Sequence, residues 1–175
     1  MQMLFDGYVA IRDFLELGGD VLVLIVFVIF AMWVLIVERF MFFSRRRREM
    51  ERAVRERWAA RPERESWNAH QIRDALVSRF KLEATAGIPM IKTLVALCPL
   101  LGLLGTVTGM IAVFEVMAVS GTGNARSMAA GVAMATVPTM AGMVGALSGV
   151  FAGTTLARKA DRSVEKLRDS LTMDI

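Results

Sequence analysis

Two uncharged stretches decide the fold of this chain: TLVALCPLLGLLGTVTGMIAVF at residues 93–114 and SMAAGVAMATVPTMAGMVGALSGVFAGTTLA at residues 127–157. About 18 or more consecutive apolar residues without charge are long enough to cross a bilayer as an α-helix. Both stretches exceed that length. We therefore predict that each is a transmembrane helix.

A third apolar run, VLVLIVFVIFAMWVLIV, occupies residues 21–37. It extends to residue 43 if the pair Glu38 and Arg39 reaches the membrane interface with its charged ends. Because 55% of the 175 residues are apolar, little is left for a separate soluble domain of about 100–150 residues. The predicted fold is all-α: an integral membrane protein with three transmembrane helices and helical cytoplasmic extensions.

The distribution of basic residues predicts the topology, because short loops rich in Lys and Arg stay in the cytoplasm. Thirteen Lys and Arg lie in residues 44–92 and five follow residue 157, whereas the loop between the last two spans has only Arg126. We therefore predict an outer-face amphipathic helix (1–20), a first transmembrane helix (21–43), a basic helical cytoplasmic segment (44–90), a second transmembrane helix (91–118), a short periplasmic loop (119–126), a third transmembrane helix (127–157) and a cytoplasmic tail (158–175).

The basic residues next to the spans also predict contact with anionic phospholipid, at about 1 kcal/mol for each residue near the surface. The candidates for headgroup contact are Arg45, Arg46, Arg47 and Arg48. A plain flank that stops transfer of the first span is an equally good interpretation of this run. No nucleic-acid motif, metal cluster, cofactor motif or catalytic triad is recognised, so neither an enzyme nor a nucleic-acid partner is expected.

The last two spans are rich in small residues, which let helix backbones approach closely in lipid. This pattern predicts tight helix packing in an assembly through Gly102, Gly105, Gly109, Gly131, Ala135, Gly142, Gly145 and Gly149.

Thr106 and Thr139 each lie near the middle of a predicted span, and the two spans run in opposite directions. Such a hydroxyl either bonds to a carbonyl of its own helix or lines a polar pore. The residues alone leave both alternatives open.

The stretches CPLLGLLGTVTGMIAVF and MAAGVAMATVPTMAG resemble the second-span and third-span signatures of the ExbB/TolQ/MotA proton-channel family. The chain looks most like the shorter ExbB variants of accessory TonB systems. It departs from the family pattern at Met134, where the family has an acidic residue, and at Ser148, where proline is common.

This resemblance implies a pore-lining role for Thr106 and Thr139 in a homo-oligomeric, pentameric ring in the bacterial inner membrane, with the N-terminus periplasmic and the C-terminus cytoplasmic. It also implies an ExbD-like single-span partner with a membrane aspartate, a TonB-like protein, and proton-driven import of iron chelates through the outer membrane. The interiors of the last two spans contain no Asp, Glu, His, Lys or Arg, so the partner would supply the proton relay. The alternatives are a TolQ-like subunit of an envelope-integrity motor and a non-conducting membrane scaffold.

Overall fold

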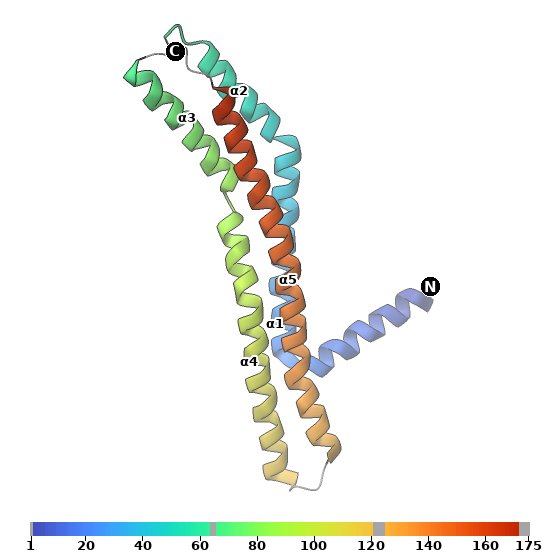
Figure 1. The fold of residues 1–175 in the computed structure, drawn as a ribbon. Coiled ribbons are helices and arrows are strands. Elements are labelled where there is room, and N and C mark those ends of the chain that lie inside the picture. The colour runs from blue at the N-terminus through green and yellow to red at the C-terminus, as the bar shows by residue number, and fades with distance from the viewer. Residues whose placement is uncertain (1, 64–65, 121–124, 172–175) are drawn as a thin grey trace. The chain divides into compact units, whose positions relative to one another are not determined.

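The computed structural model describes residues 2–63, 66–120 and 125–171, with the side chains of residues 2–17, 120, 125 and 127 left outside the description. The described residues form helices and no strand, which confirms the predicted all-α fold (Figure 1). The five helices are α1 (Gln2–Arg45), α2 (Arg47–Ala59), α3 (Trp67–Thr85), α4 (Ile88–Ser120) and α5 (Ala125–Ser170).

Three helical segments are long and apolar enough to cross a membrane: Gly18–Arg45, Trp67–Val119 and Met128–Ser170. The predicted number of spans is therefore confirmed. The side chains of most of the predicted amphipathic helix, and residues 121–124 of the predicted periplasmic loop, lie outside the described part of the chain.

Helix α1 has a kink at Gly19, where φ is 64° and ψ is −168° (Figure 1). Glycine adopts a positive φ without the steric cost that a Cβ atom imposes. Gly19 therefore permits the kink, which lies directly before the apolar run of the first span.

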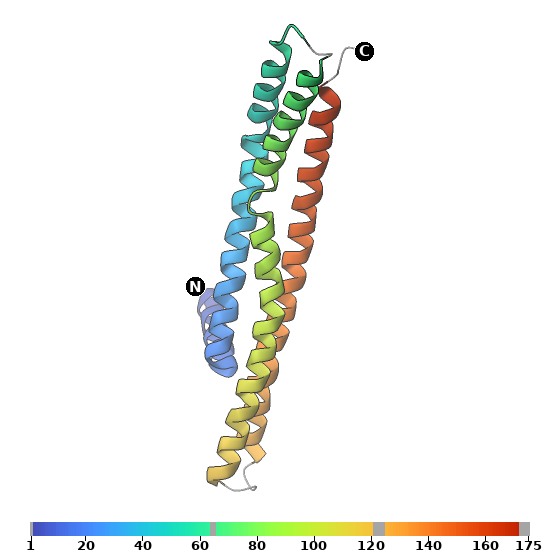
Figure 2. The ribbon, with the colours of Figure 1, turned by 90° about the vertical axis from the view of Figure 1, so that its left-hand side faces the viewer.

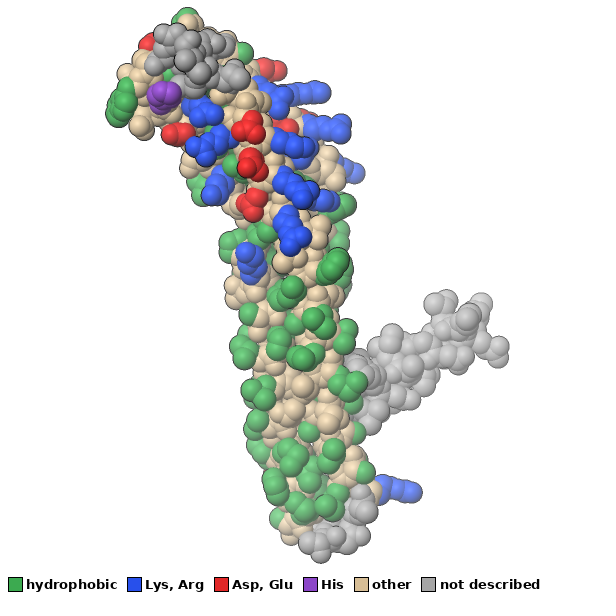
Figure 3. Space-filling view, in the orientation of Figure 1, with side chains coloured by type: hydrophobic (Ala, Val, Ile, Leu, Met, Phe, Trp, Pro, Cys, Tyr) green, Lys and Arg blue, Asp and Glu red, His purple; other side chains and the backbone are tan. Residues whose placement is uncertain are grey.

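The chain forms two compact units. The first, the span unit, comprises Met1–Trp33 and Thr93–Val150, and the second, the basic unit, comprises Val34–Lys92 and Phe151–Ile175. Hydrophobic side chains cover the faces of α4 and α5 that are visible in the span unit, and charged side chains gather over the helices of the basic unit (Figure 3).

In the span unit, α1 buries one stripe of side chains at helical spacing and exposes the opposite face. Leu22, Ile25 and Met32 have no exposed surface, whereas Phe27 and Phe30 are about two thirds exposed. A cluster of Val28, Cys98 and Ala146 joins α1, α4 and α5 in the core. An exposed apolar face is typical of a helix that meets lipid.

Glycines bring the backbones of α4 and α5 into contact, and these two helices run side by side in both ribbon views (Figures 1 and 2). A Cβ atom at Gly102 would lie 3.1 Å from the Cα of Thr139, and one at Gly109 would lie 2.6 Å from the Cα of Ala135. A Cβ at Gly142 would lie 2.5 Å from the carbonyl oxygen of Cys98. Side chains of neighbouring helices fill the space next to the other small residues: Pro138 at Gly105, Val113 at Gly131, Ile29 at Gly145, and Met32 and Val95 at Gly149.

These contacts are all made between helices of one chain. The small residues singled out in the sequence therefore allow the helices within one span unit to pack closely against one another.

In the basic unit, α2 and α3 pack on each other and on the C-terminal part of α5 (Figure 2). Their shared core consists of Trp58, Ala69, Phe80, Ala84, Ile88, Ala160, Leu167 and Leu171. The connection from α2 to α3 contains Pro62, which interrupts a helix because it has no backbone N–H to donate.

One arginine binds the end of a helix in the basic unit, and another lies beside the turn between α3 and α4. The guanidinium of Arg73 donates to the carbonyl oxygens of Leu171 at 2.9 Å and Arg168 at 2.8 Å, which lie at the C-terminus of α5. Between α3 and α4, Gly87 has a φ of 79°, and a Cβ there would lie 2.7 Å from Nε of Arg39. Cationic donors suit a helix C-terminus because its last carbonyl groups lack helical partners.

Candidate functional site

The two threonines of the last spans make different hydrogen bonds. The hydroxyl of Thr139 donates across the helix interface to the carbonyl of Gly102 at 3.0 Å, and the carbonyl of Ala135 on its own helix lies at 3.3 Å. The hydroxyl of Thr106 donates to the carbonyl of Leu103 at 2.6 Å, within α4. Both threonines are half-buried in the single chain.

The register of α4 against α5 brings the two threonines to a similar height. Gly102 faces Thr139, and Gly105 faces Pro138. Thr106 follows Gly105 directly, so along the helix pair the two threonines lie within about one turn, or roughly 5 Å, of each other. Two hydroxyl groups therefore occupy one level of the helix pair. Thr108 and Thr136, on the same two helices, donate only to carbonyls of their own helices.

The hydrogen bond from Thr139 to α4 leads to a prediction about stability. Thr139→Val keeps the shape of the side chain and removes the donor, so we expect the free energy of unfolding in detergent to fall by about 0.6 kcal/mol and by at most about 1.7 kcal/mol. Thr136→Val is the matched control, because the exposed Thr136 hydroxyl donates only to carbonyls of its own helix. Equal losses in the two variants would contradict a stabilising bond between helices.

Met134 stands where the resemblance leads one to expect an acidic residue. A Cβ atom at Gly19 would lie 3.4 Å from Cε of Met134, so this side chain faces the kink in α1. The interiors of the last two spans contain no Asp, Glu, His, Lys or Arg, the residues that usually relay protons in membranes, and their one thiol, Cys98, is buried. The threonine level supplies hydroxyl groups and no carboxylate, imidazole or ammonium group.

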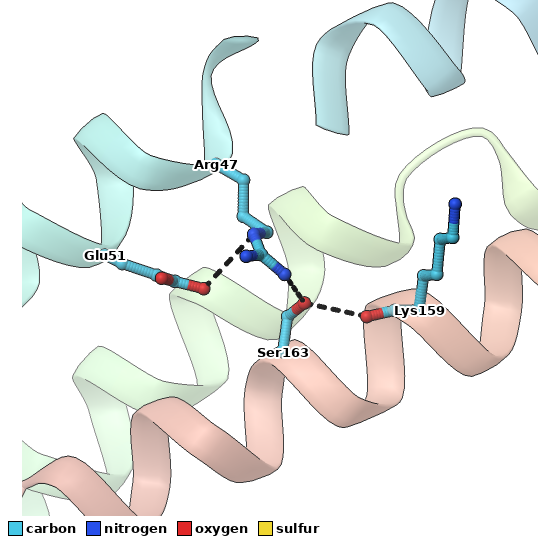
Figure 4. Close-up of polar contacts among 4 residues, drawn as sticks. All are labelled: Arg47, Glu51, Lys159 and Ser163. Carbon is cyan, nitrogen blue, oxygen red and sulfur yellow. Dashed lines mark hydrogen bonds and ion pairs between the residues drawn. The ribbon is translucent and has the colours of Figure 1, made fainter. Parts of the chain in front are cut away.

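The four arginines proposed for headgroup contact differ in the structure. Arg45 ends α1, and Arg46 connects it to α2; both are exposed, as is Arg48. Arg47 is half-buried: its guanidinium donates to the hydroxyl of Ser163 at 2.9 Å and pairs with Glu51 at 3.5 Å (Figure 4). Arg47 therefore bridges α2 and α5.

The structure adds two residues of α5 that the sequence did not single out. Ser163 is 1% exposed and donates to the carbonyl of Lys159 at 2.7 Å. The ammonium group of Lys159 lies 4.7 Å from the centre of the Phe40 ring on α1. Ser163 follows Lys159 by one helical turn and was visible in the sequence only as a small polar residue within a charged tail. The pairing with Arg47 and Phe40 joins positions more than one hundred residues apart, and no local pattern indicates it.

Comparison with known proteins gives a consistent result. The biopolymer transport protein ExbB of Helicobacter pylori is 32% identical over 92 residues, which cover 53% of this chain and 63% of that protein. The biopolymer transport protein exbB1 of Vibrio cholerae is 36% identical over 87 residues, covering 49% of this chain and 38% of the relative. A protein of Synechocystis described as ExbB-like 1 is 41% identical over 81 residues, covering 39% and 32%.

The alignments thus span less than two thirds of the length of each of these relatives. No solved structure matches the chain. A family model described as the MotA/TolQ/ExbB proton channel family matches residues 43–169, which include α2, α3, α4 and nearly all of α5. The match covers most of the chain and contains both threonines, so this multi-pass membrane protein belongs to the MotA/TolQ/ExbB proton channel family.

Proposed function

We propose that this chain is the ExbB-like subunit of a motor in the bacterial inner membrane that is driven by the proton gradient. With an ExbD-like single-span partner, it energises import through the outer membrane by way of a TonB-like protein. The observation that carries the proposal is that Thr106 and Thr139 lie at one level on two adjacent spans whose interiors are uncharged, within the region that matches the proton channel family.

The chemistry of the spans supports a division of labour between two proteins. A proton crossing a membrane needs an ionisable relay, because bare charge in hydrocarbon is costly. The last two spans contain no Asp, Glu, His, Lys or Arg, so an aspartate in the partner helix takes and releases the proton beside the threonine hydroxyls. Movement of the partner helices then transmits the energy to the TonB-like protein.

A ring of five copies is part of this proposal. The glycines are occupied by contacts inside the chain, so neighbouring copies meet through the outer faces of the spans. Those faces carry exposed apolar side chains, among them Leu100, Leu103, Phe114, Leu147 and Phe151. Lipid and a second copy of the chain are both apolar surroundings for such a face. A measurement of the oligomer's mass distinguishes the two.

The orientation follows the positive-inside rule, with the N-terminus periplasmic and the basic unit and the C-terminus cytoplasmic. Thirteen basic residues between positions 44 and 92 and five after position 157 support this placement.

Hydroxyl removal tests the proposed pore. The chain is reconstituted in liposomes with a single-span partner that carries a membrane aspartate, and proton flux is measured with a pH-sensitive dye. We expect Thr106→Val and Thr139→Val each to lower the flux about tenfold, equivalent to about 1.4 kcal/mol in barrier height. Thr136→Val should leave the flux unchanged, because the proposal places the pore beside Thr106 and Thr139, and the Thr136 hydroxyl donates only to carbonyls of its own helix.

A parallel mass determination shows whether each variant still assembles. Unchanged flux in both Thr106→Val and Thr139→Val, with assembly intact, would refute the polar pore. A chain that assembles and conducts no protons with any partner would favour the membrane scaffold.

A further inference from the structure

The basic unit contains a cavity of about 240 Å³ between the C-terminal end of α1, the start of α2 and helix α5. Its lining consists of Phe40, Phe43, Ser44, Arg47, Leu156 and Lys159. Two of these side chains are cationic, one is a hydroxyl and three are apolar. Within the part of the chain that the structure describes, no Asp or Glu belongs to this lining.

The two cations reach the cavity from different helices and are held there by different contacts. Arg47 on α2 is fixed by its hydrogen bond to Ser163 and its ion pair with Glu51, so its charge is partly compensated (Figure 4). Lys159 on α5 is exposed, and its ammonium group lies over the Phe40 ring at 4.7 Å. Lys159 is therefore the main source of positive charge that is available to a ligand.

The cavity lies where the sequence changes from apolar to charged on both helices. The apolar end of α1 closes with Phe43 and Ser44 before the arginine run, and the uncharged stretch of α5 ends at residue 157, just before Lys159. In a spanning helix such a change marks the level of the lipid headgroups, where Lys and Arg extend their charged ends. A cationic cavity at this level lies next to the phosphate groups of the lipids.

The size and chemistry of the cavity suit one headgroup. Drug-sized ligands occupy pockets of roughly 300–1,000 Å³, so this smaller space fits a group such as a phosphodiester. The cations and the Ser44 hydroxyl match its negatively charged oxygens, and the Phe40, Phe43 and Leu156 side chains match the start of an acyl chain.

We infer that this cavity is a specific site for the headgroup of an anionic phospholipid, with Lys159 as its principal ligand. A site of this kind differs from a diffuse attraction of lipid to the arginine run, because its binding depends on one lysine of α5 and one arginine of α2. It does not depend on the proposed motor function.

The test is native mass spectrometry of the purified chain in detergent, titrated with phosphatidylglycerol, with phosphatidylcholine of the same acyl chains, and with inorganic phosphate. We expect the chain to bind phosphatidylglycerol at a distinct site and to bind the other two much more weakly. Lys159→Gln should weaken phosphatidylglycerol binding about fivefold, and Lys159→Arg should retain it.

Arg158→Gln is the matched control, because Arg158 precedes Lys159 on α5, is exposed and does not line the cavity. We expect it to bind phosphatidylglycerol as the unchanged protein does. Ser44→Leu, which fills the cavity without changing charge, should also weaken binding. Circular dichroism of each variant confirms that its helices are retained.

Equal weakening by Lys159→Gln and Arg158→Gln would overturn the site in favour of diffuse attraction. Binding of phosphatidylcholine as tightly as phosphatidylglycerol, or of inorganic phosphate as tightly as the lipid, would overturn the assignment to an anionic phospholipid. None of these measurements involves a partner protein or a proton gradient, so their outcome is separate from that of the flux experiment.

Discussion

Gly109→Ala is expected to lower the free energy of unfolding of the chain in detergent. The new Cβ would lie 2.6 Å from both the Cα and the backbone nitrogen of Ala135, and no side-chain rotation can relieve a contact with backbone. Overpacking of this kind costs about 3 kcal/mol at the upper end of the usual range. Alanine returns about 1 kcal/mol through its better helix propensity, so the net loss is about 2 kcal/mol.

Gly153→Ala is the matched control on α5. A Cβ at Gly153 would meet only Ile91, at an ordinary 3.5 Å, so no overpacking offsets the better helix propensity of alanine. We expect the free energy of unfolding to rise by up to about 1 kcal/mol. The same substitution thus has opposite signs at two glycines. Denaturation followed by circular dichroism measures both, and a loss at Gly153 as large as that at Gly109 would contradict the close approach of α4 and α5.

Trp58→Ala is expected to lower the free energy of unfolding of the basic unit by about 3–5 kcal/mol, because it removes a large buried side chain and leaves a cavity. Trp58 is 4% exposed and belongs to the core that joins α2, α3 and α5. Urea unfolding of the full chain in mild detergent, followed by circular dichroism, gives the value.

Trp67→Ala provides the comparison at the start of α3. Trp67 is 73% exposed, so its removal should change the stability by no more than about 0.5 kcal/mol. If both substitutions had similar effects, the assignment of Trp58 to the core and of Trp67 to the surface would be wrong.

Much of this architecture could be predicted from local patterns. The spans could be recognised because an uncharged run of about 20 residues has no other stable place than the membrane or a large core. The break between α2 and α3 could be predicted from Pro62, and the one before α4 from Gly87, because these residues restrict or extend the available backbone conformations.

The candidate site could be predicted only in part. Thr106 and Thr139 were identified by residue type and mid-span position, but their hydrogen bonds differ, and nothing near either residue in the sequence distinguishes them. The partner of Thr139 is a backbone carbonyl on another helix. Such a contact depends on the register of α4 against α5, which a list of residues does not contain.

Length, apolar runs and the placement of charge were therefore sufficient to establish an all-α membrane protein with three spans, because each of these properties acts locally along the chain. Which residues meet across the fold could be determined only from the packed helices. Gly109 meets Ala135, Arg47 meets Ser163, and Lys159 meets Phe40, each between helices distant in sequence. The reason is physical: small residues permit a close approach, but the depth at which two helices lock together follows from the fit of all their side chains at once.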